Sequence, residues 1–117
     1  MAPLNDPVRL RAYRNALANW RFKGFIRWTE QALRGLHQEL EASTAAEVAR
    51  LMHEYVCAGG NIDEVPETRA EWSHHDFHYD FRIEVEGKRL YIETRLYFDD
   101  PDDPDDPWIH VVNVHAP

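Results

Sequence analysis

The chain has 117 residues, of which 44% are hydrophobic and 12% aromatic, and its formal net charge is −8. This length and composition predict one packed domain over residues 1–117 and exclude a disordered chain. No apolar run approaches the roughly 20 residues of a membrane span, the N-terminus lacks a signal core, and the lone Cys57 excludes an internal disulfide, so we expect a cytoplasmic protein.

Charge is divided unevenly along the chain. Residues 1–35 carry a net charge of +5, whereas the remaining residues carry −13. The basic third could contact phosphate or an acidic partner, or it could pack against the chain's own acidic half. The overall acidity argues against general nucleic-acid binding.

The N-terminal segment carries signals for two helices. Asn5 or Asp6 before Pro7 supplies a capping side chain and a fixed φ, which are typical of a helix start. Apolar residues then recur at helical spacing over residues 8–23 and, after a break at a glycine, over residues 25–41. Both segments are therefore predicted to be helical.

A third helix has the clearest end signals. Thr44 and Glu47 form a capping box at its start, and Gly59-Gly60 supplies a left-handed position at its end. The helices are thus expected to occupy about residues 7–58.

The following segment predicts a β-hairpin. Residues 61–73 are expected to form a polar loop that leads into it. Apolar and polar residues alternate over 77–85 and again over 90–98, which predicts two half-buried strands. The Glu86-Gly87 pair between them predicts a two-residue turn, because glycine readily takes the positive φ that such turns require.

The turn also fixes which residues face each other. On the apolar face the expected pairs are Val85 with Lys88, Ile83 with Leu90, Phe81 with Ile92 and Tyr79 with Thr94. On the polar face they are Arg82 with Tyr91, Asp80 with Glu93 and His78 with Arg95. A slip of one residue would expose the whole apolar set, so this register is well specified.

The last part of the chain completes the predicted sheet. Residues 99–107 form an acidic loop in which three prolines block helix and strand. Residues 108–115 are a further strand, with His110, Val112 and Val114 expected on one face. The fold class is therefore α+β, with N-terminal helices packed on one face of a small antiparallel sheet, a meander of three or more strands over about residues 75–115.

The polar face of the hairpin carries side chains suited to RNA cleavage without a metal. That reaction needs a base for the 2′-hydroxyl, an acid for the leaving oxygen and cations for the phosphate. Glu93 would be the base and His78 or His75 the acid. The phosphate clamps would be Arg82 and Arg95. The residues expected to bind the rest of the substrate are Arg69, Tyr91 and Tyr97.

The layout of helices followed by an antiparallel meander resembles the fold shared by RelE-type toxins, barnase-like nucleases and colicin-type tRNases. This resemblance covers most of the chain in outline and involves residue types rather than a matched motif. It implies a small cytosolic ribonuclease that is restrained by an antitoxin or another protein partner. Such toxins are usually basic, and this chain is acidic.

Metal sites are an alternative interpretation. Five residues at the entry to the hairpin are possible ligands for zinc or a similar ion. They are His74, His75, Asp76, His78 and Asp80, which His110 or His115 could join from the last strand. The acidic loop offers calcium ligands but lacks the glycine and closing glutamate of an EF-hand.

A non-catalytic alternative also stands, in which the polar face is a solvated surface of cross-strand ion pairs on a protein-binding or structural module. The chain has no phosphate loop, dinucleotide fingerprint, Gly-x-Ser-x-Gly elbow or CxxC pair. We therefore expect no nucleotide or other cofactor.

Overall fold

The computed structural model describes residues 2–117 and has an α+β fold: helices α1 (Pro7–Ala18), α2 (Glu30–Glu39) and α3 (Ala45–Cys57) with one mixed, mostly antiparallel sheet. The six strands are β1 (Ala2–Pro3), β2 (Ile26–Trp28), β3 (Asp63–Pro66), β4 (Phe77–Val85), β5 (Lys88–Tyr97) and β6 (Trp108–His115). Their order across the sheet is β1-β3-β4-β5-β6-β2. The predicted fold class is confirmed.

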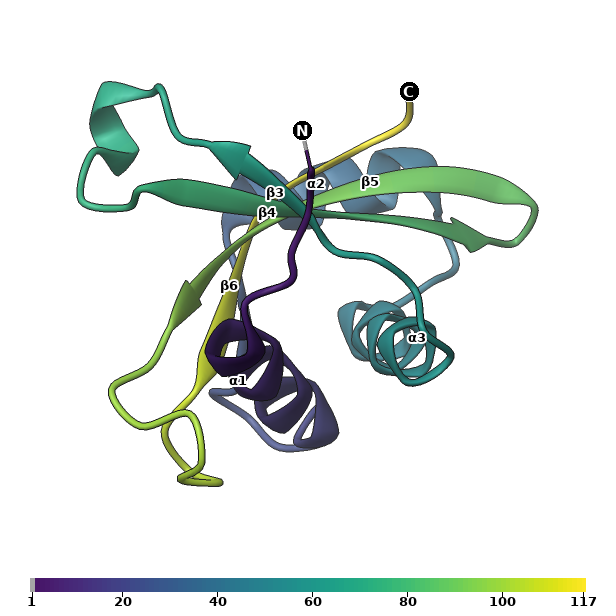
Figure 1. Cartoon of the computed structure of the whole chain (residues 1–117). Coiled ribbons are helices and arrows are strands. Elements are labelled where there is room, and N and C mark those ends of the chain that lie inside the picture. The colour runs from purple at the N-terminus through teal and green to yellow at the C-terminus, as the bar shows by residue number, and fades with distance from the viewer. Residues whose placement is uncertain (1) are drawn as a thin grey trace.

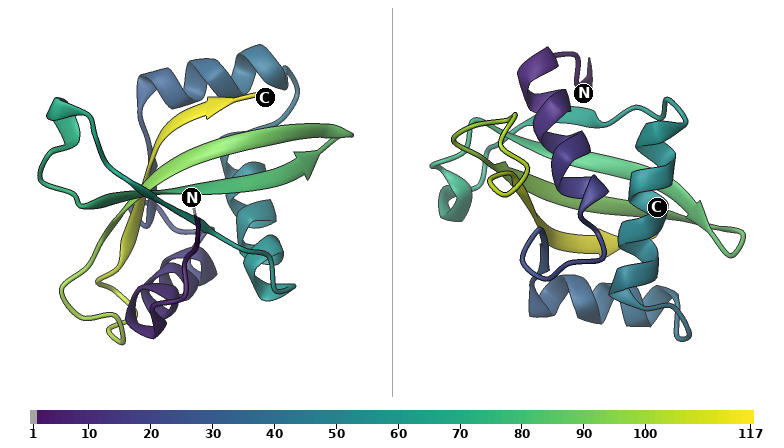
Figure 2. Two further views of the ribbon diagram at one scale, coloured as in Figure 1. Left: turned by 45° about the horizontal axis from the view of Figure 1, so that its top comes forward. Right: turned by 90° about the horizontal axis from the view of Figure 1, so that it is seen from below.

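Helices α1 and α3 cross one face of the sheet side by side, and α2 lies along the C-terminal half of β6 (Figures 1 and 2). The core lies between α1, α3 and the sheet, and its central side chains are Tyr13, Leu17, Met52, Phe81 and Ile92. Burial of these side chains supplies most of the drive for folding. The opposite face of the hairpin is left for polar residues.

The hairpin has the predicted register. Val85 pairs with Lys88 and Phe81 with Ile92, and Asp80 faces Glu93 directly. Gly87 has a φ of 76° and Glu86 a φ of 54°, as the expected two-residue turn requires. The ladder starts at Tyr79, so His78 does not pair with Arg95 within it; His78 pairs with Val65 of β3 instead.

Two segments differ from their predicted structures. Within the predicted helix over residues 25–41, Ile26–Trp28 forms a strand parallel to β6, and α2 starts only after Thr29, whose hydroxyl accepts the Ala32 backbone N–H. The predicted helix over residues 8–23 ends at Ala18. Short strands escape a periodicity argument because three residues fit a helical pattern equally well.

The sheet is also wider than predicted. Asp63–Pro66, assigned to a loop by sequence, pairs with β4 as strand β3, and Ala2–Pro3 pairs with β3. A bulge shifts β6 against β5 between Glu93 and Thr94, so Ile109 and Val114 both reach the core although simple alternation places them on opposite faces. The predicted division of residues 108–115 into two faces is therefore wrong beyond the bulge.

Gly35 permits the close approach of α2 to β6. A Cβ atom at this position would lie 2.1 Å from the carbonyl oxygen of Val114. We expect Gly35→Ala to lower the free energy of unfolding by about 1–3 kcal/mol, because this clash outweighs the gain in helix propensity. Urea unfolding measures the effect. His37→Ala on the exposed side of the same helix is the control and should change stability by less than about 0.5 kcal/mol.

Candidate functional site

The polar face of β4 and β5 carries a close group of one imidazole and two carboxylates. His78 and Asp80 alternate along β4, and Glu93 faces Asp80 from β5. His78 Nδ1 lies 3.0 Å from Asp80 Oδ1, and one ligand atom from each of the three residues lies within 4.8 Å of the others. The two residues predicted as acid and base thus share one face.

Arg95 is fully buried in an ion-pair network beneath this group. Its guanidinium contacts Glu93, with Nη1 2.9 Å from Oε2, and it also pairs with Glu67, which comes from the segment after β3. The Trp72 ring covers it, with the guanidinium carbon 4.8 Å from the ring centroid. Since Arg95 has no exposed side-chain surface, its predicted role as a phosphate clamp does not fit its position.

Two other arginines are accessible beside the group. Arg69 is 41% exposed and pairs with both Glu93 and Glu67. Arg82 is 44% exposed and pairs with Asp63 at 2.8 Å. The cations that contact Glu93 are therefore Arg69 and Arg95, whereas Arg82 pairs with a residue of β3.

The pKa values of Asp80 and Glu67 are shifted in opposite directions. Burial raises the pKa of Asp80, and the hydrogen bond from His78 only partly offsets this. Burial also acts to raise the pKa of Glu67, but the Arg69 backbone N–H and the charge of Arg95 outweigh it, so that pKa is lowered. Glu67 is therefore a stable anion that holds both arginines in place.

His75 lies outside the group of His78, Asp80 and Glu93. Its Nε2 is 2.9 Å from the hydroxyl of Tyr97, and its ring meets the Tyr97 ring edge-on. Tyr91 faces Arg82 directly, two positions before Glu93 on β5, and its ring packs against His115. Of the predicted site residues, the structure therefore brings together His78, Glu93, Arg69, Arg82 and Arg95, with Tyr91 beside Arg82, and it sets His75 and Tyr97 apart from them.

Sequence reasoning missed Asp63, Glu67 and Trp72 as partners of the site. All three lie in the segment predicted to be a polar loop, and the structure folds that segment back over the sheet. One signal was available, since Asp63 and Val65 alternate with Glu64 and Pro66 as in a short strand. Nothing in the sequence links Glu67 to Arg95, which is 28 residues away.

Metal binding at this face would use the same three residues. Among residues 2–117, His78, Asp80 and Glu93 are the one group of three or more suitable side chains close enough to share an ion, and neither the neighbouring histidines nor the acidic loop adds another. Two guanidinium groups already contact Glu93, and they would repel a divalent cation. In the acidic loop, carboxylates of Asp100, Asp103 and Asp106 instead accept backbone N–H groups.

The histidines near Arg95 predict a dependence of stability on pH. Burial lowers the pKa of His110, as do the charges of Arg27 and Arg95, and burial likewise lowers that of His75. Unfolding restores ordinary imidazole pKa values near 6.5, so this contribution to stability is present above about pH 6.5 and is lost as pH falls through the lower folded pKa. When the pH is lowered from 7.5 to 5, we expect the urea midpoint of unfolding to fall less for His110→Gln than for the wild-type protein. Equal losses in both proteins would contradict this assignment.

No protein-family model, curated protein or solved structure gives a significant match to this chain. Within the part of the chain that the structure describes, no helix has the length and apolar character needed to span a bilayer. Function must therefore be inferred from the geometry of the site.

Proposed function

We propose that this protein is a small ribonuclease that cleaves RNA without a metal ion, using the polar face of β4 and β5. The observation that carries the proposal is the position of His78 and Glu93, with ligand atoms within 4.8 Å of each other, between two accessible arginines, Arg69 and Arg82. Imidazole, carboxylate and guanidinium are the groups that this reaction requires.

The reaction begins at the 2′-hydroxyl of a nucleotide. The Glu93 carboxylate takes its proton, and the 2′-oxygen attacks the adjacent phosphorus. The bond to the 5′-oxygen breaks, and the His78 imidazolium gives that oxygen a proton. The products are a 2′,3′-cyclic phosphate and a free 5′-hydroxyl.

The remaining residues assist these two. Asp80 accepts a hydrogen bond from His78 Nδ1 and so fixes the orientation of the imidazole ring, which leaves Nε2 for the leaving group. Arg69 lies on a loop and moves from Glu93 to the phosphate when RNA binds. This movement also leaves the Glu93 carboxylate free to act as the base. Arg95 and Glu67 are positioning residues, because both are buried.

A direct test is to incubate a single-stranded RNA with the purified protein in EDTA. We expect fragments that end in 2′,3′-cyclic phosphate, and no cleavage of the DNA of the same sequence, because DNA lacks the 2′-hydroxyl. If intact RNA remains under all conditions, the proposal fails and a non-catalytic binding or structural module is favoured. We further propose that a protein partner restrains this activity in the cell, so that expression of the wild-type chain alone slows growth.

Metal binding is the second candidate, favoured by the compact group of His78, Asp80 and Glu93. It predicts that gently purified protein retains a zinc-like ion and that His78→Ala loses it. Metal-free protein that cleaves RNA in EDTA would exclude a catalytic role for such an ion.

A further inference from the structure

Next to the proposed catalytic group lies a continuous cluster of partly exposed rings, the ring cluster. Successive members are 4.2–6.1 Å apart between ring centroids, and none is buried. The members are Trp72, His74, His75, Tyr97, Trp108 and His110. Tyr97 and Trp108 form a parallel stack, with centroids 4.2 Å apart and planes inclined by 6°.

The ring cluster and the catalytic group occupy the same face of β5. Glu93, Arg95 and Tyr97 alternate along that strand, so all three point to one side. Tyr97 lies four positions after Glu93 along the strand, which corresponds to about 13 Å at the usual rise per residue. A short extended segment of nucleic acid spans this distance.

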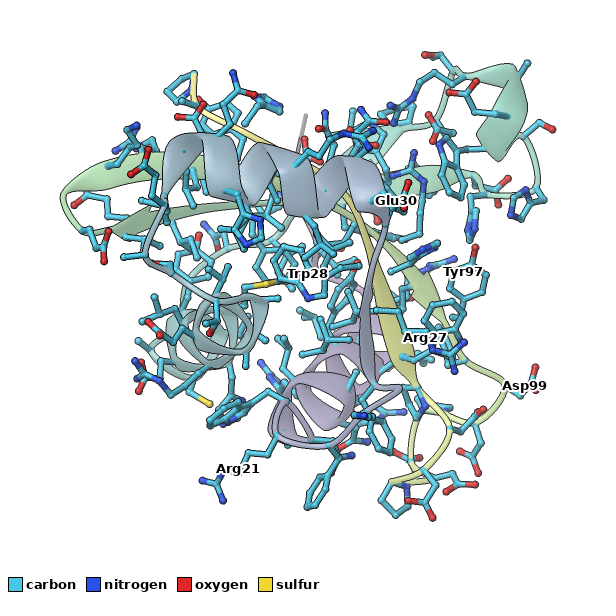
Figure 3. All side chains as sticks on the ribbon, turned by 180° about the vertical axis from the view of Figure 1, so that it is seen from behind. Arg21, Arg27, Trp28, Glu30, Tyr97 and Asp99 are labelled. Atoms are coloured by element: carbon cyan, nitrogen blue, oxygen red, sulfur yellow. The ribbon has the colours of Figure 1, made fainter. Side chains whose placement is uncertain are left out.

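Charged groups around the ring cluster favour a base over a phosphate beside the stacked rings. The Arg27 guanidinium lies 3.9 Å from the centroid of the Trp108 ring, which in turn stacks on Tyr97; Figure 3 labels Arg27 and Tyr97. A hollow of about 240 Å³ beside the stack is lined by Tyr97, Phe98, Asp99, Asp106 and Trp108. Its carboxylates would repel a phosphate but accept hydrogen bonds from the amino or imino groups of a base.

We propose that the ring cluster binds the unpaired bases of single-stranded RNA whose backbone crosses the catalytic group. This inference rests on the proposed function, since it names the substrate class of the same site. Aromatic rings bind unpaired bases by stacking, and this accepts any base because each has a π-face. Burial and nearby arginines lower the pKa of His75 and His110, so these two rings are neutral near pH 7 and suited to stacking. A duplex keeps its bases stacked on one another and cannot use these rings.

The test uses a 2′-O-methyl oligonucleotide, which binds but cannot be cleaved because its 2′-oxygen is blocked. Fluorescence anisotropy gives Kd for the single strand and for a duplex of the same sequence. We expect the duplex to bind at least tenfold more weakly. Tyr97→Leu and Trp72→Leu should each weaken single-strand binding about tenfold. Far-UV circular dichroism checks that each variant is folded.

Phe22→Leu is the matched control, because Phe22 is a large hydrophobic residue that is 63% exposed and lies between α1 and β2, outside the ring cluster. Its Kd should equal that of wild type. Unchanged binding in both ring variants, or equal affinity for duplex and single strand, would overturn the inference. If the protein never cleaves RNA but the ring variants bind it more weakly, the binding site is supported and the proposed ribonuclease function is contradicted. If the protein cleaves RNA but the ring variants bind with the wild-type Kd, the ribonuclease function is supported and the binding site is contradicted.

Discussion

Replacing Arg95 with methionine is expected to lower the free energy of unfolding by about 3–5 kcal/mol. The Arg95 guanidinium has no exposed surface and lies between the carboxylates of Glu67 and Glu93, whose side chains are 2% and 11% exposed. Methionine fills a similar volume but leaves two like charges close together away from water. Arg69 still neutralises part of this charge. The expected loss in free energy of unfolding is therefore smaller than the cost of two isolated buried charges.

Urea unfolding measures this effect, with Arg34→Met as the control. Arg34 is 73% exposed and lies 3.8 Å from Glu30 on α2, so its removal should change stability by less than about 0.5 kcal/mol. Adding Glu67→Gln and Glu93→Gln to Arg95→Met should restore a large part of the loss, because no buried charge is then unpaired. A triple variant as unstable as Arg95→Met alone would show that packing, rather than charge, explains the defect.

His78→Ala is expected to reduce RNA cleavage by about 10²- to 10⁴-fold, the usual contribution of a general acid. The variant removes the proton donor to the leaving 5′-oxygen and also the partner of Asp80. Single-turnover cleavage of a labelled RNA measures the rate. His53→Ala, which changes an imidazole near the end of α3, should cleave at the wild-type rate.

Glu93→Gln provides a second measurement on the same mechanism. If Glu93 and His78 act in one proton-transfer sequence, the double variant should cleave about as slowly as the slower single variant. Multiplicative losses would indicate that the two residues act independently, which contradicts the paired roles of base and acid. Unfolding curves separate loss of activity from loss of structure, because Glu93 also pairs with Arg95.

The central part of the fold follows from local patterns in the sequence. Alternation over β4 and β5 and the Glu86-Gly87 turn gave the pairing of Asp80 with Glu93, and the capping box at Thr44 gave α3. Strands β2 and β3 could not be found in this way. They are three and four residues long, and they form through contacts with distant segments rather than through a local period.

The candidate site was predictable to a similar extent. Alternation alone places His78, Glu93 and Arg95 on one face, because a strand directs every second side chain to the same side. Alternation does not show which of these side chains is covered. The segment around Glu67 and Trp72 buries Arg95, and that arrangement depends on a tertiary contact over 28 residues.

The narrow outer strands have a consequence for how the protein behaves at high concentration. The sheet ends in β1 and β2, which have only two and three residues, and β1 contains Pro3, which cannot donate a backbone hydrogen bond. Strand β5 has β4 and β6 on its two sides, whereas β4 pairs with β3 only over its first four residues, Phe77–Asp80. The two outermost strands give copies of the chain little free backbone on which to extend the sheet, which protects these two edges against aggregation.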